Sequence, residues 1–165
     1  MQLITNLDEK NIVNVLLEGA GLNAFIFHTN FQLQFCCENR KKFNGKNIPM
    51  QINLSILSDW WFGDKKEWDK IVDKLTDGFN FVEPDEPVLA FKLAALRWTD
   101  GSVINSVDLS SEKLELKFEC GASITIMNNN EMDCAWEIYE EKFNDYNNCW
   151  SVLCEDGKIY YNVPI

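Results

Sequence analysis

Histidine, proline and long apolar runs are scarce in this 165-residue sequence. It holds one histidine and four prolines, and no stretch approaches the roughly 20 apolar residues of a membrane-spanning helix. The first nine residues have no basic group ahead of an apolar run, so they do not resemble a signal peptide. We therefore expect a cytoplasmic protein that does not enter a membrane.

Basic residues are also few. Lys and Arg number 15 against 26 Asp and Glu, which gives a formal net charge of −11. A chain this acidic is repelled by phosphate backbones and anionic lipid, so direct binding to nucleic acid or a membrane surface is not expected. Apolar residues at 46% fit a folded globular protein. The length suits one domain, which we take as residues 1–165.

The patterns that mark metal sites and catalysis are missing. Cys36 and Cys37 are adjacent, and the other cysteines are five or more residues apart, unlike the paired spacing of zinc ligands. In the cytoplasm we expect all six to be reduced, as small buried hydrophobic residues. The one histidine, His28, has no recognisable catalytic partner, and no serine lies in a G-x-S-x-G motif. We predict no catalytic residue, no metal and no cofactor.

A repeat at half the chain length is the most specific internal pattern. Residues 16–25 resemble residues 98–107 at an offset of 82, and residues 31–36 resemble 114–119 at an offset of 83. Each copy continues into an alternating segment and then a tryptophan cluster. The pattern predicts an α+β fold of two antiparallel β-meanders, with pseudo-repeats at about 1–82 and 83–165. Alternatively, the likeness reflects only the alternation and glycine turns that unrelated meanders share.

Strands and hairpins dominate the local pattern. Residues 113–119 alternate apolar and charged side chains, which predicts a strand with one buried face. Asp-Gly pairs favour tight hairpin turns. Such pairs predict one hairpin between strands 93–98 and 103–109 and another between strands 150–154 and 159–163.

Two helices are expected. Apolar residues at helical spacing predict the first over residues 64–78, with a charged opposite face and Gly78 near its C-terminal end. A shorter helix is expected over 8–17. Two prolines and three acids make residues 81–87 a loop between the copies. A helical turn is expected within 137–148.

The excess of acidic over basic residues lies almost entirely in the second copy. Residues 1–82 hold 9 basic and 10 acidic side chains, whereas residues 83–165 hold 6 and 16. In the second copy the acids alternate with aromatic residues, which suits a face that binds a cationic protein. The alternative is a solvated acidic surface whose aromatic side chains point inward. Trp136 itself is assigned to the core, because Trp61, which is taken as its repeat counterpart, has apolar neighbours. The predicted partner-binding residues are Glu83, Asp85, Glu86, Glu131, Asp133, Glu137, Tyr139, Glu140, Glu141, Asp145 and Tyr146.

The meander signature resembles a known group of proteins. It consists of Gly101-x-x-Ile104, Leu114-x-Leu116-x-Phe118, Gly121-x-x-Ile124-x-Ile126 and Trp136-x-Ile138. With the small size and acidity, it is similar to immunity proteins of bacterial contact-dependent growth inhibition and polymorphic toxin systems. The resemblance implies a non-catalytic protein that binds and neutralises a cognate toxin domain, often a basic nuclease. It transfers no individual functional residue.

Two other functions stay open. One is a small-ligand-binding or regulatory β-domain, in which cysteines and aromatics line a cavity. The other, which the sequence favours less, is a small hydrolase that uses His28 and carboxylates.

Overall fold

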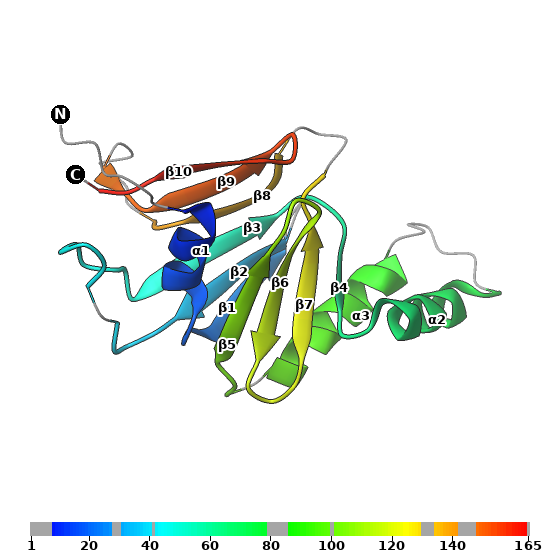
Figure 1. The fold of residues 1–165 in the computed structure, drawn as a ribbon. Coiled ribbons are helices and arrows are strands. Elements are labelled where there is room, and N and C mark those ends of the chain that lie inside the picture. Colours follow the sequence, from blue (N-terminus) through cyan, green and yellow to red (C-terminus); the bar gives the residue numbers. More distant parts are fainter. Residues whose placement is uncertain are drawn as a thin grey trace.

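The computed structural model describes residues 8–27, 31–40, 42–78, 86–99, 101–129, 134–141 and 148–164. Within these residues the fold has two antiparallel sheets and three α-helices (Figure 1). The helical elements are α1 (Glu9–Leu17), α2 (Lys65–Thr76), α3 (Glu86–Leu96) and the 3₁₀ turn η1 (Arg97–Thr99). The predicted α+β class with β-meanders is confirmed.

The larger sheet has six strands and the smaller sheet has four. In spatial order the six are β1 (Gly21–Phe27), β2 (Phe31–Cys36), β3 (Gln51–Ile56), β8 (Cys134–Tyr139), β9 (Ser151–Glu155) and β10 (Lys158–Asn162). The four are β4 (Trp60–Phe62), β7 (Ser123–Met127), β6 (Lys113–Phe118) and β5 (Ile104–Leu109). No helix among the described residues is long and apolar enough to cross a membrane.

The two meanders exchange their fourth strands. The first meander, β1-β2-β3, continues in its sheet with β8 from the second half of the chain, where Leu54 pairs with Ile138. The second meander, β5-β6-β7, continues with β4 from the first half, where Ile124 pairs with Phe62. Each sheet is therefore built from both halves of the chain.

The strand registers of the two meanders match residue by residue. Leu22 pairs with Phe35 in the first, and Ile104 pairs with Phe118 in the second, which are the sequence offsets of 82 and 83. A register shift follows each pair, at Asn23 and at the equivalent Asn105. This agreement extends to a β-bulge, a feature that general alternation does not require. A common ancestry of the two halves stays a prediction.

One repeat assignment is wrong by a single residue. Trp136 pairs with Ile56, and Trp60 pairs with the equivalent Ile126, so Trp60 is the structural counterpart of Trp136. Trp60 and Trp136 are both buried, whereas Trp61 is only partly buried. Successive side chains of a strand point to opposite faces, so a slip of one residue exchanges the core face for the outer face.

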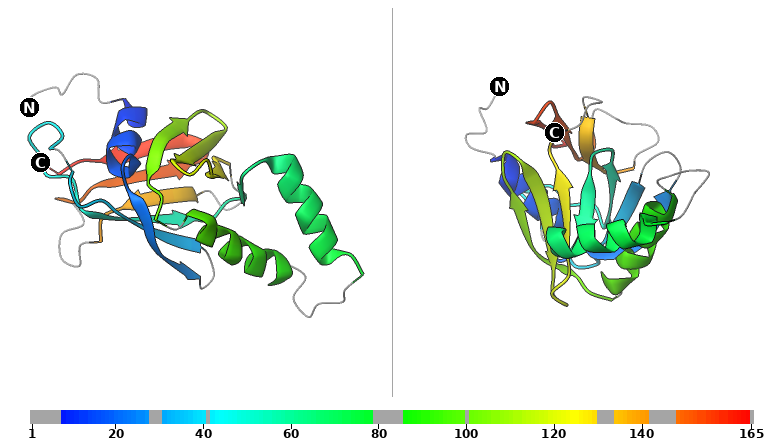
Figure 2. Two further views of the ribbon diagram at one scale, coloured as in Figure 1. Left: turned by 90° about the horizontal axis from the view of Figure 1, so that it is seen from below. Right: turned by 90° about the vertical axis from the view of Figure 1, so that its right-hand side faces the viewer.

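The core lies between the two sheets. Figure 2 shows the sheets facing each other, with α2 and α3 projecting from one end. Both sheets contribute fully buried side chains, and α1 adds an apolar stripe. These residues include Leu33, Leu54, Trp136 and Ile138 from the larger sheet, Leu114, Leu116, Ile124 and Ile126 from the smaller sheet, and Ile12, Val13, Leu16 and Leu17 from α1.

The predicted helices and the second hairpin are confirmed. Asp64 caps α2 by accepting hydrogen bonds from the backbone N–H groups of Lys66 and Glu67. Gly78 follows the helix with a φ of 76°. Asp8 caps α1 in the same manner. The Asp156-Gly157 turn joins β9 to β10.

The predicted strand over 93–98 is wrong. Residues up to Leu96 belong to α3, and Arg97–Thr99 form η1. The segment Lys-Leu-Ala-Ala-Leu-Arg consists of strong helix formers and lacks a period of two, so the helix is the natural outcome. Asp100, the first residue of the expected turn, lies outside the described residues.

The predicted loop over 81–87 is wrong at its end. Glu86 and Pro87 open α3, where a proline is tolerated because first-turn N–H groups have no partner within the helix. Residues 81–85 lie outside the described part. Of the helical turn expected within 137–148, residues 137–139 belong to β8, and 142–147 are not described.

Candidate functional site

Strand β8 carries the predicted partner-binding residues that the structure brings together. Trp136 and Ile138 point into the core and are fully buried. Because strand side chains alternate, Glu137 and Tyr139 point to the opposite, outer face of the six-stranded sheet. Their neighbours across the strands also belong to this outer face: Ser55 and Leu153 lie opposite Glu137, and Asn53 and Ser151 lie opposite Tyr139.

A hydrogen bond fixes Tyr139 on this face. The side-chain amide of Gln32 on β2 donates to the Tyr139 hydroxyl over 2.7 Å. Gln32 belongs to the row of Ser55 and Glu137, so the bond runs diagonally across the sheet. The tyrosine ring is thereby held beside the Glu137 carboxylate.

Glu137 sets the electrostatics of the outer face. Burial raises the pKa of its carboxyl group above the usual value. Burial also raises the pKa of Tyr139, and the charges of Glu137 and Glu141 add to that shift. The pKa of Cys134 is raised by burial and then by the charges of Glu137 and Glu155. The carboxylates of Glu137 and Glu155 therefore both act on the Cys134 thiol.

Few cations accompany the carboxylates around β8 in the described part of the chain. Residues 134–141 and 148–164 contain five acidic side chains and one lysine, Lys158. Four of the five form no ion pair with any described residue: Glu137, Glu141, Glu155 and Asp156. The Glu140 carboxylate accepts a hydrogen bond of 3.4 Å from the backbone N–H of Trp150. This region therefore presents unbalanced negative charge.

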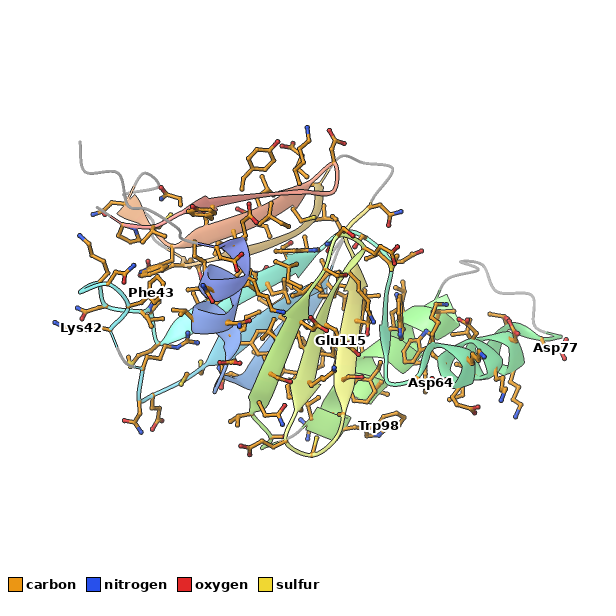
Figure 3. All side chains as sticks on the ribbon, viewed as in Figure 1. Lys42, Phe43, Asp64, Asp77, Trp98 and Glu115 are labelled. Atoms are coloured by element: carbon orange, nitrogen blue, oxygen red, sulfur yellow. The ribbon has the colours of Figure 1, made fainter. Side chains whose placement is uncertain are left out.

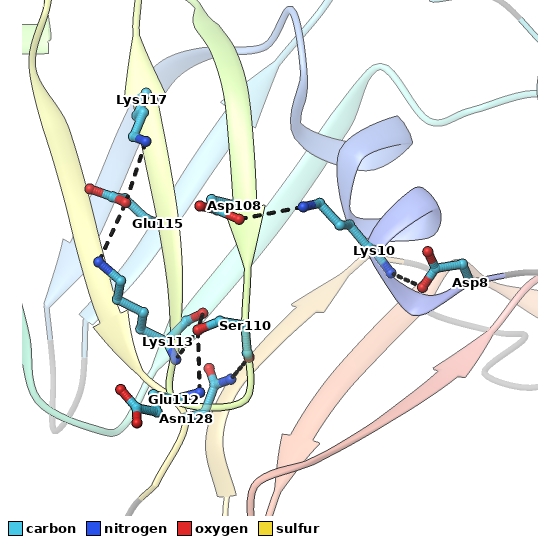
Figure 4. Close-up of polar contacts among 9 residues, drawn as sticks. All are labelled: Asp8, Lys10, Asp108, Ser110, Glu112, Lys113, Glu115, Lys117 and Asn128. Carbon is cyan, nitrogen blue, oxygen red and sulfur yellow. Dashed lines mark hydrogen bonds and ion pairs between the residues drawn. The ribbon is translucent and has the colours of Figure 1, made fainter.

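Four acidic side chains elsewhere in the described structure form ion pairs. In the four-stranded sheet, Glu115 lies 3.5 Å from Lys113 and 3.6 Å from Lys117, and Asp108 lies 3.4 Å from Lys10 (Figure 4). On α2, Glu67 pairs with Lys70 and Asp69 pairs with Lys65. Other described acids, including Glu9, Asp73 and Glu119, also form no ion pair with a described residue. What distinguishes β8 and the β9-β10 hairpin is therefore the ratio of five acids to one lysine.

The structure places five of the eleven predicted binding residues. Glu137 and Tyr139 lie together on β8, and Glu140 and Glu141 follow the strand directly. The backbone of Glu86 opens α3, which packs against α2 and β4 and belongs to another part of the molecule. The remaining residues lie outside the described part: Glu83, Asp85, Glu131, Asp133, Asp145 and Tyr146.

The sequence did not indicate Glu155 or Cys134 as members of this site. Cys134 lies opposite Glu155 where β8 pairs with β9. The Asp156-Gly157 turn predicted the β9-β10 hairpin, but no local pattern reveals that β9 pairs with β8 on its other side. The β8-β9 pairing is what brings Glu155 to Cys134.

A cavity beside α1 was also missed. Its volume is about 540 Å³, and its lining includes Lys42 and Phe43, whose side chains are labelled in Figure 3. The Arg40 guanidinium in its wall donates from Nη1 to the carbonyls of Val15 and Leu16, over 3.1 and 2.6 Å, at the C-terminal end of α1. Burial lowers the pKa of Arg40, and an interaction with the Cys37 side chain opposes this shift. Such a cation has no sequence signature.

The cysteines differ in exposure. Cys149 and Cys154 are buried as expected, but Cys120 is exposed in the turn between β6 and β7, so that part of the prediction is wrong. All six are free thiols. No three His, Cys, Asp or Glu side chains among the described residues lie close enough together to hold a metal ion. His28 lies outside the described part.

Comparison with known proteins gives no match to a protein-family model, to a curated protein or to a solved structure.

Proposed function

We propose that this chain is a cytoplasmic immunity protein that binds and neutralises a cognate basic toxin domain, with a nuclease as the favoured class. The observation that carries the proposal is the local excess of acid around β8-β10, where the described residues 134–141 and 148–164 hold five acidic side chains and one lysine. Four of the five carboxylates form no ion pair with a described residue. Unpaired acids steer a cationic partner toward the surface and become paired on binding.

The proposed mechanism is electrostatic and involves no catalysis. The carboxylates of Glu137, Glu140 and Glu141 imitate the phosphates of the toxin's nucleic-acid substrate and occupy the cations that bind it. Tyr139 supplies rigid contact area beside them. Because the fold has already removed water from part of the Glu137 carboxylate, a lysine or arginine that pairs with it restores a lost interaction.

Co-expression tests this function directly. The candidate toxin is the C-terminal domain of a large secreted protein encoded immediately upstream. We expect this domain to stop bacterial growth when expressed alone, and the chain to restore growth when both are expressed. Failure of the chain to restore growth against a toxic upstream domain, or the absence of such a domain, would contradict the proposal.

Two charge variants locate the binding surface in the same assay. The triple variant Glu137→Gln/Glu140→Gln/Glu141→Gln is expected to lose protection. Its matched control, Asp69→Asn/Asp73→Asn/Asp77→Asn in and just after α2, changes the net charge equally and is expected to protect fully. Equal protection by both variants would remove β8 from the interface.

A second candidate function is small-ligand binding at the cavity beside α1. Arg40 favours it, since its guanidinium lines the cavity and its orientation is fixed by two backbone carbonyls. A guanidinium edge of this kind suits a carboxylate. Thermal unfolding in the presence of acetate, succinate or citrate tests the idea: stabilisation that is lost in Arg40→Met supports it, and unchanged unfolding temperatures with all three reject it.

A further inference from the structure

Strand β1 has an outer edge that no described strand covers. It pairs with β2 on one side and is the last strand of its sheet. Beyond Gly21, no described backbone group other than those of β2 pairs with residues 22–27. The strand carries no charged residue, and Phe25 and Ile26 are 36% and 43% exposed. A free, uncharged and apolar edge is a template for another strand.

The equivalent strand in the other half of the molecule is protected in two ways. Strand β5 is packed against α1, the helix that precedes the first meander. It also carries Asp108, which pairs with Lys10 of α1. At the offset of 82, the residue of β1 that corresponds to Asp108 is Ile26. The two halves share strand register but differ at this edge.

Beside β1 lies a groove rather than a packed helix. It has a volume of about 280 Å³ and runs between residues 22–25 and the end of α3 and η1, including Leu96 and Thr99. Trp98 of η1 is 59% exposed (Figure 3). The Trp98 ring packs against Phe62 and Phe91 rather than lining the groove. The lining itself is mixed, with the apolar Leu22, Ala24, Phe25 and Leu96 and the polar Asn23, Arg97 and Thr99.

We propose that β1 pairs antiparallel with β1 of a second copy of this chain. An antiparallel edge is self-complementary about a two-fold axis, because each strand offers the other the same alternation of N–H and C=O groups. The two sheets then become one continuous sheet of twice six strands. Strand pairing alone buries too little surface for a stable dimer, so the groove between β1 and the end of α3 belongs to the contact.

The charge distribution permits this contact despite the net charge of −11. Residues 1–82, which contain β1, have nearly balanced charge. Strand β8 is the third strand from β1. At about 4.8 Å per strand, the β8 strands of the two copies lie about 34 Å apart. That separation is several times the Debye length of about 8 Å, so their acids repel weakly.

This inference goes beyond the proposed function and does not depend on it, because it concerns the edge of the six-stranded sheet at β1 and not the surface at β8. Sedimentation velocity on the full chain alone tests it, up to a concentration of about 1 mM. We expect a dimer of twice 19.1 kDa that dissociates on dilution. Amide hydrogen exchange of residues 24–27 should become faster as the dimer dissociates. A 19.1 kDa monomer at every concentration would overturn the proposal.

One pair of variants assigns the edge. Ile26→Asp gives β1 the charge that β5 carries, and it is expected to raise the dimer dissociation constant at least tenfold. The matched control is Tyr160→Asp on β10, at the opposite edge of the same sheet, where Tyr160 is 49% exposed. It should dimerise like the unchanged chain. Dimerisation that survives Ile26→Asp, or fails equally in Tyr160→Asp, would contradict the assignment to β1.

Discussion

Trp136 donates its indole N–H to the side-chain oxygen of Asn128 over 2.9 Å, and both side chains are buried. Asn128 follows β7 of the smaller sheet, and Trp136 lies in β8 of the larger one. The amide of Asn128 also donates to the carbonyl of Ser110 over 2.8 Å. The bond therefore joins the two sheets through the core. Trp60, the counterpart of Trp136, has a buried indole N–H with no hydrogen-bond partner among the described residues.

We predict that Asn128→Ala destabilises the fold by about 1–3 kcal/mol, because the buried indole N–H of Trp136 loses its acceptor. Urea unfolding followed by tryptophan fluorescence measures the change. A loss well below 1 kcal/mol would show that this bond contributes little.

The two equivalent tryptophans provide a matched comparison. Trp136→Phe leaves the Asn128 oxygen without its donor, whereas Trp60→Phe removes a donor that has no partner. We expect Trp136→Phe to cost about 1–3 kcal/mol more than Trp60→Phe. Equal losses in urea unfolding would contradict this reading of the core.

Glu137 should make stability depend on pH. Burial raises its folded-state pKa above the value of about 4.5 for an exposed Glu. Its contribution to stability is therefore present below the unfolded pKa and is lost as pH rises through the folded pKa. Because glutamine does not ionise, the Glu137→Gln variant does not undergo this loss of stability. We predict that the stability of the Gln variant relative to the unchanged chain increases between about pH 4 and pH 7, measured by urea unfolding. A relative stability that falls over this range would contradict the cause assigned to the shift.

The cysteines should react with alkylating reagents at very different rates. Cys120 is exposed, and a hydrogen bond with the Ser102 side chain lowers its pKa, which increases the reactive thiolate. Cys154 is buried, and burial raises its pKa to about 11. With iodoacetamide at neutral pH, peptide mass spectrometry should find Cys120 alkylated at least about 100-fold faster than Cys154 in the folded chain.

The control for this prediction is Ser102→Ala. It removes the first cause of the lowered Cys120 pKa and should slow alkylation at Cys120 while leaving Cys154 unchanged. Equal rates at the two cysteines would show that the turn or the core opens readily.

Local patterns predicted the elements that depend on nearby residues. The helical spacing of Trp68 and Ile71 located α2, and the repeat offsets predicted matching registers that extend to Asn23 and Asn105. The exchange of β4 and β8 depends on contacts distant in sequence, so no local period reveals it. The Asp100-Gly101 turn pattern predicts a strand over 93–98, but the helix-forming composition of that segment decides its structure.

The candidate site was predictable to a similar extent. The repeat assigned Trp136 to the core, although through the wrong counterpart, and the interleaved acids and aromatics predicted Glu137 and Tyr139 as binding residues. Their common outer face follows from the structure of β8. The approach of Glu155 to Cys134 needs the β8-β9 pairing, and Arg40 needs the tertiary position of α1. These relationships exist only once the sheets assemble.

The central claim is that the acidic surface at β8 binds a basic toxin domain, and stopped-flow association kinetics at two ionic strengths test it most directly. Compared with the unchanged chain, Glu137→Gln/Glu140→Gln/Glu141→Gln should associate with the upstream toxin domain at least about tenfold more slowly at low salt and nearly equally at high salt. The matched Asp69→Asn/Asp73→Asn/Asp77→Asn control should stay within about twofold of the unchanged chain at both. Equal association rates for the two triple variants at low salt would contradict the claim.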